Sequence, residues 1–525
     1  MVRKDYKVFS FIIIHPSVVK CEFSIKRHVC MSLLEIIVLC PLLGAIGLSF
    51  LPSGSNANGP TGRLAYIIAL AVSCWTLVLS LFLWVQFDSG TADFQFCVER
   101  AWIPSANLYC ALGVDGISLF FVLLTTLLIP ICLLTGWTSV QVYPKEYCIA
   151  FLVLESSVIL IFTALDLLFF YVFFETVLIP MFAVVGIWGS RERKVRAAYQ
   201  FFLYTFLGSV LMLIALLALY IDAGSLDYRI LREYTLTPEK QWFLWLAFFA
   251  SFAVKVPLIP VHLWLPEAHV EAPTAGSVLL AGVLLKLGSY GLLRFSMVLF
   301  PHASLVFAPA VFLLSLLGVV YASLTTIRQV DLKKIIAYSS VAHMGVVTLG
   351  LFSWTLQGVE GSLLLQLSHG AVSAGLFLCI GSLYDRTKTR VLPYYSGLVQ
   401  TMPLFATIFL ILTLANIGVP GTSSFPAEML AFFGTFKVNP IAGIIAATGM
   451  VTGAAYSLWL YNRLIFGTIK THAFQSFADF SRREVWMLLP LVILALWMGI
   501  TPDVFLTPMH PATMLVLEYG FECTQ

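Results

Sequence analysis

The stretch Ala247–Gly291 reads AFFASFAVKVPLIPVHLWLPEAHVEAPTAGSVLLAGVLLKLGSYG and decides the fold of this chain. It places Lys255 and Lys286 inside two apolar runs of membrane-spanning length, and prolines interrupt the first run. A lysine at the centre of a membrane helix costs about 2.5 to 3.5 kcal/mol on insertion scales. Two such lysines beside a broken helix therefore predict a protein that moves charge across a membrane.

The composition is that of a polytopic membrane protein. Of 525 residues, 60% are hydrophobic and only 11% are charged, and the mean hydropathy is +0.94. An ordinary soluble domain has about a quarter of its residues charged. The formal net charge of +3 is small, and no basic tract or aromatic-spaced basic face predicts binding to nucleic acid.

Motifs for cofactors are missing from the sequence. The ten cysteines are scattered, with no CxxC pair to open a zinc or iron-sulfur site, so we interpret them as structural thiols. Neither GxGxxG after a strand nor GxxxxGK[ST] occurs, which leaves no cradle for a dinucleotide or a nucleoside triphosphate. Any redox or ATP energy is therefore expected to enter through another subunit.

The first thirty residues form a basic N-terminal extension (1–30). It contains a short apolar run, Phe9–Ile14, which is too short to cross a bilayer. Because the segment is basic and poor in acids, a targeting segment is one interpretation. The interpretation we prefer is a non-essential extension with Met31 as an alternative start.

Apolar segments long enough to span about 30 Å of hydrocarbon recur from Met31 onward. The fold class we predict is an all-α polytopic membrane protein with about fourteen transmembrane helices. The predicted spans are 33–51, 64–87, 114–136, 147–165, 167–188, 198–220, 242–264, 273–296, 305–326, 334–352, 359–383, 402–433, 440–467 and 484–500.

Charges in the predicted loops set an orientation. Loops after the odd-numbered spans carry the basic residues, except the loop after span seven, which holds Glu267, His269 and Glu271. Loops after the even-numbered spans are acidic, balanced or nearly uncharged. By the positive-inside rule, the odd loops face the cytoplasm or mitochondrial matrix, and both termini lie on the opposite side. The basic loop residues are Arg63, Lys145, Arg191, Arg193, Lys194, Arg196, Arg328, Lys333, Lys334, Arg386, Lys388, Arg390, Lys470, Arg482 and Arg483.

Two of the spans are broken. Pro257, Pro260 and Pro266 interrupt span seven, and the run Ile417–Pro426 interrupts span twelve just before Glu428. The breaks lie five spans apart, so they enter the membrane from opposite faces. Paired broken helices of this kind indicate an inverted-repeat transporter with an ion site near the membrane midplane.

The chain is accordingly divided into five parts. After the extension, residues 31–136 hold the first three spans. Residues 147–296 form the first antiporter-like repeat of five helices, and residues 305–467 form the second, inverted repeat. Residues 484–525 hold the last span and a C-terminal tail.

Glu175 and Lys255 are the first two candidate functional residues. Glu175 lies in the middle of a span, where a carboxylate is a functional hypothesis by default, and its candidate partner is Lys255. The alternative for Glu175 is a carboxylate satisfied by a hydroxyl or backbone group. The alternative for Lys255 is a lysine that reaches an interface along its apolar stem.

Lys286 is the central candidate. It sits between Gly282 and Gly288, and these small residues leave space for water or a neighbouring helix. Burial favours a neutral amine, whereas a nearby carboxylate favours the charged form. A lysine held between these influences can take up and release a proton.

His343, His369 and Glu428 extend the candidate site through the second repeat. The two histidines lie in consecutive spans, and a histidine that titrates near neutrality suits a proton relay. A satisfied interhelical hydrogen bond is the open alternative for each histidine. Glu428 follows the second break and continues the same line of polar residues toward the far side.

Weaker candidates have structural explanations. Asp115 and Glu35 are interpreted as helix-end residues, with Asp115 as an N-cap, and Asp166 as a span-end residue solvated at the interface. Glu155 lies within span four and stays open.

Metal binding is not predicted. The segment that holds His262, Glu267, His269 and Glu271 contains HLWLPEAH, which lacks the HExxH arrangement of a zinc helix.

Around the intramembrane charged residues, the sequence resembles the subunit 4 family of the respiratory NADH:ubiquinone oxidoreductase (complex I). Subunit 4 is one of the antiporter-like membrane subunits of that complex. The resemblance covers Met31 to about Gly520. Plant and algal mitochondrial members are the most similar. The matching stretches are FFYVFFETVLIPMF, SRERKVRAAYQFFLYT, Phe252–Gly291, QVDLKKIIAYSSVAHM and LSHGAVSAGLF.

The resemblance implies a proton pump driven by distant electron transfer. It assigns Glu175 and Lys255 as the pair at the broken helix, Lys286 as the central lysine, and His369 as its link to the terminal acid Glu428. The residues before Glu428 read Phe425-Pro426-Ala427, where the family more usually has glycine.

The resemblance also implies partners and a location. The chain itself would hold no redox centre and no metal, whereas NADH, FMN, iron-sulfur clusters and ubiquinone would bind to partner subunits. The expected partners are other complex I membrane-arm subunits, including neighbouring antiporter-like subunits, together with the lipid bilayer, protons and internal water. The expected location is the mitochondrial inner membrane, with both termini on the intermembrane-space side.

Two other functions stay open from the residues alone. A Mrp-type cation/proton antiporter subunit shares the intramembrane lysines and the broken helices. A scaffold that holds neighbouring subunits and conducts nothing would need the same charges for assembly only.

Overall fold

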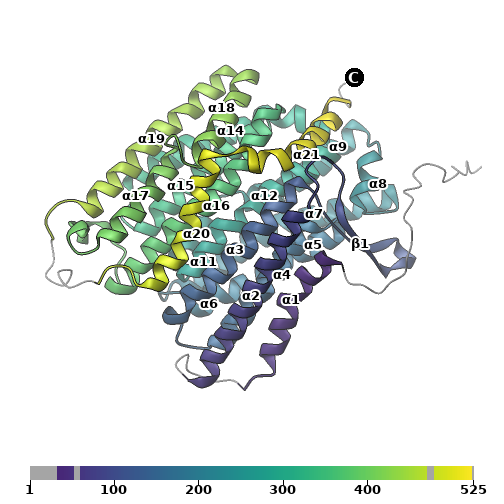
Figure 1. Cartoon of the computed structure of the whole chain (residues 1–525). Coiled ribbons are helices and arrows are strands. Elements are labelled where there is room, and N and C mark those ends of the chain that lie inside the picture. The colour runs from purple at the N-terminus through teal and green to yellow at the C-terminus, as the bar shows by residue number, and fades with distance from the viewer. Residues whose placement is uncertain (1–31, 53–58, 470–477, 523–525) are drawn as a thin grey trace, which may run out of the picture.

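The computed structural model describes residues 32–52, 59–469 and 478–522. Within these ranges the chain is a bundle of helices with one two-stranded sheet (Figure 1). The predicted extension, residues 1–30, lies outside the described residues. The helices and strands are α1 (Leu33–Ser49), α2 (Pro60–Gln86), β1 (Gln95–Ile103), β2 (Leu108–Val114), α3 (Gly116–Ser139), α4 (Pro144–Thr163), α5 (Leu167–Thr176), α6 (Leu178–Trp188), α7 (Lys194–Ala223), α8 (Tyr228–Glu233), α9 (Pro238–Lys255), α10 (Trp264–Glu271), α11 (Thr274–Leu279), α12 (Leu285–Gly291), α13 (Met297–Leu299), α14 (Pro301–Arg328), α15 (Leu332–Leu351), α16 (Leu356–Thr387), α17 (Pro403–Ile417), α18 (Ser424–Val438), α19 (Pro440–Ile465), α20 (Arg482–Ile500) and α21 (Asp503–Glu522).

The polytopic all-α fold predicted from the sequence is confirmed. Among the described residues, 11 helical segments are long and apolar enough to cross a membrane, and α1 and α17 are shorter apolar helices. Each of the fourteen predicted spans coincides with helix in the structure. Several helices, such as α7 and α16, run past their predicted ends because polar residues extend them beyond the apolar core.

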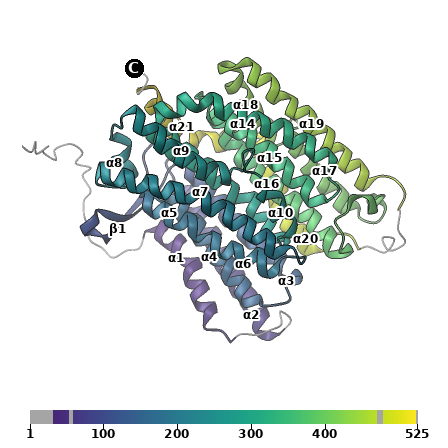
Figure 2. The same ribbon diagram turned by 180° about the vertical axis from the view of Figure 1, so that it is seen from behind.

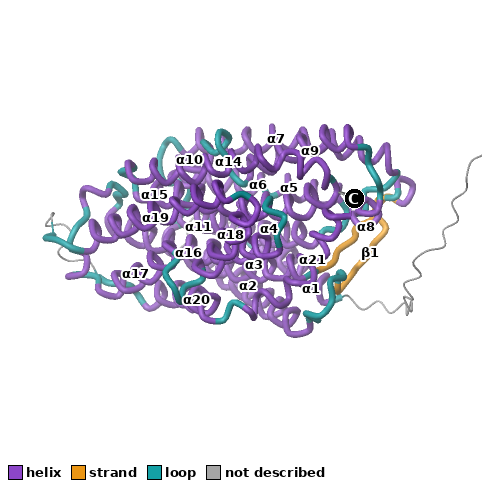
Figure 3. The backbone as a smooth tube through the Cα atoms, turned by 90° about the horizontal axis from the view of Figure 1, so that it is seen from above, coloured by secondary structure: helices purple, strands orange, loops and turns teal. Residues whose placement is uncertain are grey.

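The helices form an inner group and an outer group. The α16 helix and the segment from α11 to α13 are buried along their apolar length, and α3 and α15 are mostly buried. The α2, α14, α19 and α20 helices instead expose apolar side chains outward, as expected where lipid takes the place of water. Seen from behind, α7 and α9 run across the near face (Figure 2), and the bundle seen from above is elongated (Figure 3).

Both predicted breaks are present. The α9 helix ends at Lys255 and α10 begins at Trp264, whereas α17 ends at Ile417 and α18 begins at Ser424. Pro266 lies in the first turn of α10 and does not take part in the break, because proline is tolerated where no intrahelical N–H bond is needed.

Further irregularities were not predicted. The span that holds Glu175 is divided between α5 and α6 at Val177. Two π-helical turns, η2 (Leu280–Leu284) and η3 (Leu292–Ser296), flank α12, which carries Lys286. Such π turns appear frequently at functional sites. Apolar periodicity over a wholly buried helix contains no signal for them.

The described part of the chain also contains a β-hairpin that the sequence reading omitted. β1 and β2 pair antiparallel between α2 and α3. Arg229 of α8 forms two ion pairs, one with Glu99 of β1 and one with Asp227, each at 2.6 Å. The hydrogen bonds to Asp227 raise the pKa of Arg229 despite the opposing effect of burial, so the guanidinium stays charged and ties α8 to the hairpin.

The predicted C-terminal tail is a helix as far as residue 522. The α21 helix lies across one end of the bundle (Figure 1) and packs on α3 and α16. Its contact with α3 is backbone to backbone: a Cβ on Gly116 would lie 1.8 Å from the carbonyl oxygen of Pro508. Only glycine permits this approach.

Gly116→Ala is therefore expected to displace α21 and to lower the stability of the assembled protein by about 1 to 3 kcal/mol, the usual cost of overpacking. Thermal unfolding of the purified protein measures the effect. Gly47→Ala is the matched control, because a Cβ at Gly47 in α1 meets no atom within 4 Å. Equal behaviour of the two variants would contradict the docking of α21.

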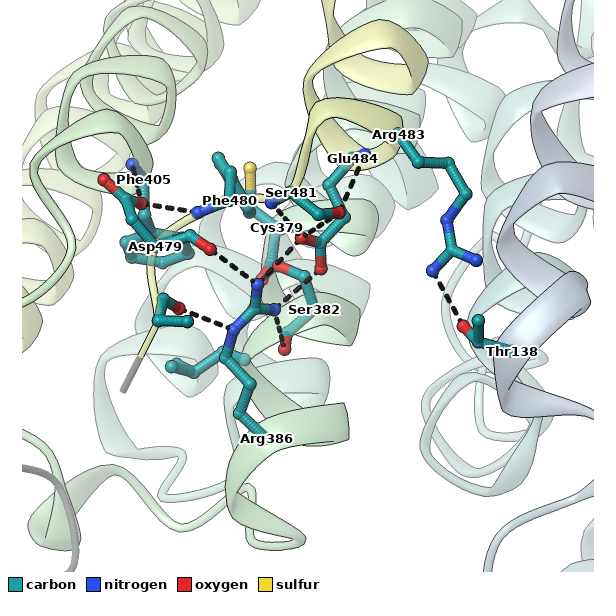
Figure 4. Close-up of polar contacts among 12 residues, drawn as sticks. Thr138, Cys379, Ser382, Arg386, Phe405, Asp479, Phe480, Ser481, Arg483 and Glu484 are labelled. Atoms are coloured by element: carbon teal, nitrogen blue, oxygen red, sulfur yellow. Dashed lines mark hydrogen bonds and ion pairs between the residues drawn. The ribbon is translucent and has the colours of Figure 1, made fainter. Parts of the chain in front are cut away.

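A polar cluster ties the end of α16 to the start of α20 (Figure 4). Arg386 donates to both carboxylate oxygens of Glu484 at 2.7 Å and to the carbonyl oxygens of Ala478 and Asp479 at 3.0 Å. Such a two-pronged pair fixes geometry as well as charge. The cluster therefore fixes the last span against the helix that carries His369.

Candidate functional site

Glu175 and Lys255 lie near each other at the break after α9. Lys255 is buried as the last residue of α9, and its amine lies 4.5 Å from the centre of the Phe174 ring. The charges of Glu175 and Lys255 influence each other, but the two groups form no direct ion pair in the described structure. The lysine instead faces the aromatic ring next to the glutamate, an arrangement that favours a cation.

The Glu175 carboxylate has unused hydrogen-bonding capacity. One of its oxygens, Oε1, is buried without a hydrogen-bond partner among the described residues. Ser209 of α7 faces the carboxylate. The predicted direct pairing of Glu175 with Lys255 is therefore not present, and an electrostatic interaction joins the two groups instead.

Lys286 is fully buried in α12. Its amine donates to the carbonyl oxygen of Ala281, which lies in the π turn η2, and it lies 2.9 Å from Nδ1 of His369 on α16. A buried amine must be hydrogen-bonded to be tolerated in an apolar interior. Here one partner is a fixed backbone carbonyl and the other is a side chain able to exchange a proton.

Close helix packing brings Lys286 to His369. A Cβ on Gly370 of α16 would lie 3.0 Å from the carbonyl oxygen of Gly282, and a Cβ on Gly282 would lie 2.4 Å from Leu128 of α3. The sequence predicted space for water or a neighbouring helix around Lys286. In the structure, neighbouring helices occupy that space.

His369, His343 and Glu428 continue from Lys286 in that order. The ring centres of His369 and His343 are 5.6 Å apart, and Nδ1 of His343 lies 3.3 Å from Oε1 of Glu428. The three side chains come from α16, α15 and α18. We call Lys286, His369, His343 and Glu428 the relay.

A small cavity lies beside the Glu428 end of the relay. Its volume is about 20 Å³, and Asn416 and Tyr456 contribute to its walls together with His343 and Glu428. A cavity of this size admits one water molecule, and the four polar side chains in its otherwise apolar lining offer hydrogen-bond partners. The Nε2 atom of His343 is buried without a hydrogen-bond partner among the described residues, so this histidine has capacity for one more bond.

The second break positions Glu428. Gly418 has φ +79°, and a Cβ there would lie 3.0 Å from Oε2 of Glu428. Pro426, where the sequence departs from the family, lies in the first turn of α18, where proline disturbs no helical hydrogen bond. The departure therefore leaves the Glu428 carboxylate beside His343.

Gly418→Ala is expected to push the Glu428 carboxylate away from His343. For the proton pump that the resemblance implies, this variant should reduce proton translocation. Gly421→Ala is the matched control, because Gly421 has φ +89° but a Cβ there meets nothing within 4 Å. Both variants carry the strain of about 1 to 2 kcal/mol for a left-handed alanine. Only Gly418→Ala should change the pumping ratio of protons to electrons, and an equal change in both variants would contradict the assignment.

Two charged groups that the sequence placed in loops are buried. Lys333, counted among loop residues from the sequence, is buried and donates to the carbonyl oxygen of Ala272 at 2.8 Å. Arg390, also counted as a loop residue, is fully buried and donates to the carbonyl oxygen of Val270. Charge counting along the sequence treated both as solvated. It does not show that Lys333 is buried in the first turn of α15, or that the segment holding Arg390 packs against the bundle.

Two predicted structural residues have larger roles than expected. Asp115 caps α3 as predicted, but it also forms a buried ion pair with Arg294, a residue of η3 that the sequence reading left out. Asp166 was expected to be solvated at the interface. It is instead buried and caps α5 by accepting from the N–H groups of Leu168 and Phe169.

Glu155 and His269 are not members of the relay, although His269 lies close enough to Lys286 and His369 for their charges to interact. Glu155 is fully buried and accepts a hydrogen bond from Thr76 at 2.5 Å. His269 is buried and stacks on Phe377 with ring centres 4.7 Å apart. Within the described ranges, no group of three or more His, Cys, Asp or Glu side chains is placed to hold a metal ion.

Comparisons with known proteins give a consistent result. Residues 164–455 match the family model described as "NADH:quinone oxidoreductase/Mrp antiporter, TM". The chain is 58% identical to the NADH-ubiquinone oxidoreductase chain 4 of Chondrus crispus, over 91% of this chain and 96% of the relative.

Two solved structures are also similar. A chain of respiratory complex I from Thermus thermophilus with bound NADH has a TM-score of 0.84 at 30% identity. The match covers 93% of this chain and 99% of the Thermus chain. A chain of the Mrp complex from a Dietzia species has a TM-score of 0.80 at 20% identity, with 93% of this chain and 98% of that chain covered, which shows a shared fold.

Proposed function

This chain belongs to the family of NADH:quinone oxidoreductase and Mrp antiporter membrane subunits, as a chain 4 of the proton-translocating NADH:ubiquinone oxidoreductase, and we propose that protons cross it along the relay. The relay consists of Lys286, His369, His343 and Glu428. The observation that carries the proposal is the sequence of contacts from the Lys286 amine through two histidine rings to a buried carboxylate.

The switch in the proposal is the pair Glu175 and Lys255. In this proposal, bringing their charges together or apart changes the electrostatic potential at Lys286. Support comes from the packing of α9 on α12, the helix that carries Lys286: a Cβ on Gly288 of α12 would lie 2.9 Å from Lys255 Cβ. Two unit charges 4 Å apart interact by about 4 kcal/mol at an effective dielectric constant of 20. Moving one proton against 100 mV costs about 2.3 kcal/mol, so one such pair is sufficient for the step.

The transfer steps follow from the residue types. Neutral His369 accepts a proton from Lys286 at Nδ1 and can release one from its other ring nitrogen. That proton crosses to His343, whose ring centre lies 5.6 Å away, and enters at the unpartnered Nε2. His343 then releases a proton from Nδ1 to the ionised Glu428 carboxylate at the 3.3 Å contact. The carboxylate then releases it on the side where α18 ends.

The energy comes from partner subunits in this proposal. NADH, FMN, iron-sulfur clusters and ubiquinone bind there, and the chain contacts other membrane-arm subunits, including neighbouring antiporter-like subunits. We place the chain in the mitochondrial inner membrane with both termini on the intermembrane-space side. Residues 147–296 and 305–467 are the two inverted repeats, with Lys286 in the first and both histidines in the second.

The proposal is tested on the intact membrane complex. Blue-native electrophoresis with an in-gel NADH dehydrogenase stain, followed by identification of this chain in the stained band, is expected to place it in a large complex. A Mrp-type antiporter subunit would instead migrate without flavin and iron-sulfur partners and would exchange sodium for protons in vesicles. A scaffold would lose assembly when Glu175 or Lys255 is replaced, whereas the proposed pump loses proton translocation with assembly intact.

A further inference from the structure

A long groove on the outside of the bundle lies apart from the relay. It has a volume of about 1070 Å³, larger than ordinary small-molecule pockets of about 300 to 1,000 Å³. Residues of α14, of the loop between α15 and α16, of the junction of α18 and α19, and of α21 line it. The ends of α14, α18 and α19 and the α21 helix all lie at the same end of the bundle in Figure 1.

The walls of the groove suit a hydrocarbon chain. Leu305, Ala308, Phe312 and Leu316 line it along α14, and Ile441 and Ile445 line it along α19. From Leu305 to Leu316, α14 rises by about 16 Å. One leaflet of the hydrocarbon core is about 15 Å thick. The apolar wall therefore matches the depth of one leaflet.

The mouth of the groove is polar and carries opposite charges. Lys437, at the end of α18, and Glu518, on α21, both line it and are exposed. Neither side chain forms an ion pair within the part of the chain that the structure describes. Gln357 and Asn439 lie at the same mouth. Trp354 also lines it, and tryptophan favours the membrane–water interface.

We propose that this groove binds one phospholipid whose headgroup carries a phosphate and a primary ammonium group, as in phosphatidylethanolamine. Lys437 binds the phosphate, Glu518 accepts hydrogen bonds from the ammonium group, and an acyl chain lies between α14 and α19. A trimethylated headgroup offers Glu518 no N–H donor. A doubly anionic lipid meets one cation and one carboxylate, so its second phosphate is repelled by Glu518.

The inner end of the groove points toward the relay. Leu316 of α14 lines the groove and Val319, one turn further, lines the cavity beside His343 and Glu428. On α19, Ile445 lines the groove and Gly449, one turn further, lines the same cavity. A bound acyl chain thus separates bulk lipid and water from the relay. This consequence rests on the proposed function, whereas the lipid site does not.

The test measures lipid bound to the intact purified complex. The complex is exchanged against deuterated dioleoyl-phosphatidylethanolamine, dioleoyl-phosphatidylcholine or cardiolipin, and retained lipid is counted by mass spectrometry after detergent washing. The wild-type complex is expected to retain phosphatidylethanolamine, and Lys437→Gln and Glu518→Gln are each expected to lower its retention by about tenfold, the effect of one charged hydrogen bond. Ala308→Trp fills the apolar part of the groove and changes no charge, and it is also expected to lower the retention of phosphatidylethanolamine.

Arg463→Gln is the matched control, because Arg463 is an exposed cation at the other end of α19 and does not line this groove. It should leave the retained phosphatidylethanolamine unchanged. Equal retention of all three lipids, retention that survives Lys437→Gln and Glu518→Gln, or a neighbouring protein chain cross-linked to residue 308 would overturn the proposal. Because retention requires no proton pumping, failure of the relay hypothesis would leave this result untouched.

Discussion

Lys286→Met is expected to lower proton translocation by about a hundredfold, the lower range of what a proton-transfer group contributes. Methionine has a similar shape and no proton to give, so the relay loses its first member. In the wild-type chain the Lys286 amine donates to the carbonyl oxygen of Ala281 and contacts His369. The substitution removes these bonds and also the cost of burying a charged amine, so we expect the apolar packing to stay in place. Proton uptake by vesicles, measured with a pH-sensitive dye during NADH oxidation, gives the result.

Lys286→Arg separates charge from proton transfer. Arginine keeps the positive charge and the donors, but it does not release its proton in proteins. We therefore expect Lys286→Arg to assemble and to pump no better than Lys286→Met. Lys240→Met is the matched lysine control, since Lys240 is an exposed residue paired with Asp222 at 2.8 Å. Full pumping by Lys286→Arg would rule out a proton carrier at this position.

Glu428→Gln is expected to have a similarly large effect. Glutamine keeps the size of the side chain and can still bond to His343, but it cannot take the proton that arrives there. Proton translocation should fall by about a hundredfold, whereas the amount of assembled complex should stay unchanged. Proton-to-electron stoichiometry in vesicles, together with the intensity of the band on a native gel, measures both quantities.

Glu155→Gln is the matched control for Glu428→Gln. Glu155 is equally buried, accepts a hydrogen bond from Thr76 and takes no part in the relay. We expect near-normal pumping from this variant. If both glutamine variants lose pumping to the same extent, the specific path through His343 and Glu428 is not supported, and a general need for buried carboxylates is the better explanation.

Much of the site follows from residue type and position in the sequence. Lys255, Lys286, Glu175 and Glu428 lie in apolar runs, where charge is costly and so marks function. Their mutual contacts do not follow. The sequence suggested a direct pair of Glu175 with Lys255, whereas in the structure Phe174 lies against the lysine. It also contains no signal for which nitrogen of His343 faces Glu428.

Four of the features that sequence reasoning missed share one cause. The hairpin of β1 and β2, the helix α21 and the buried Lys333 and Arg390 all lie outside the long apolar runs. Hydropathy identifies segments that lipid must surround, because every span needs about 20 apolar residues. It says little about polar segments that fold back over the bundle, where a few specific hydrogen bonds decide the conformation.

By itself, the sequence determined a fourteen-span membrane protein with two broken helices and intramembrane charges, because the length of an apolar run and the cost of a buried charge are local properties. Only the tertiary structure decided that the Lys286 amine bonds to the carbonyl oxygen of Ala281 and contacts His369. It also decided that the ring centres of the two histidines lie 5.6 Å apart and that the Glu428 carboxylate packs against Gly418. These contacts join residues far apart in the chain. They depend on how closely glycines let helices approach, which no local pattern records.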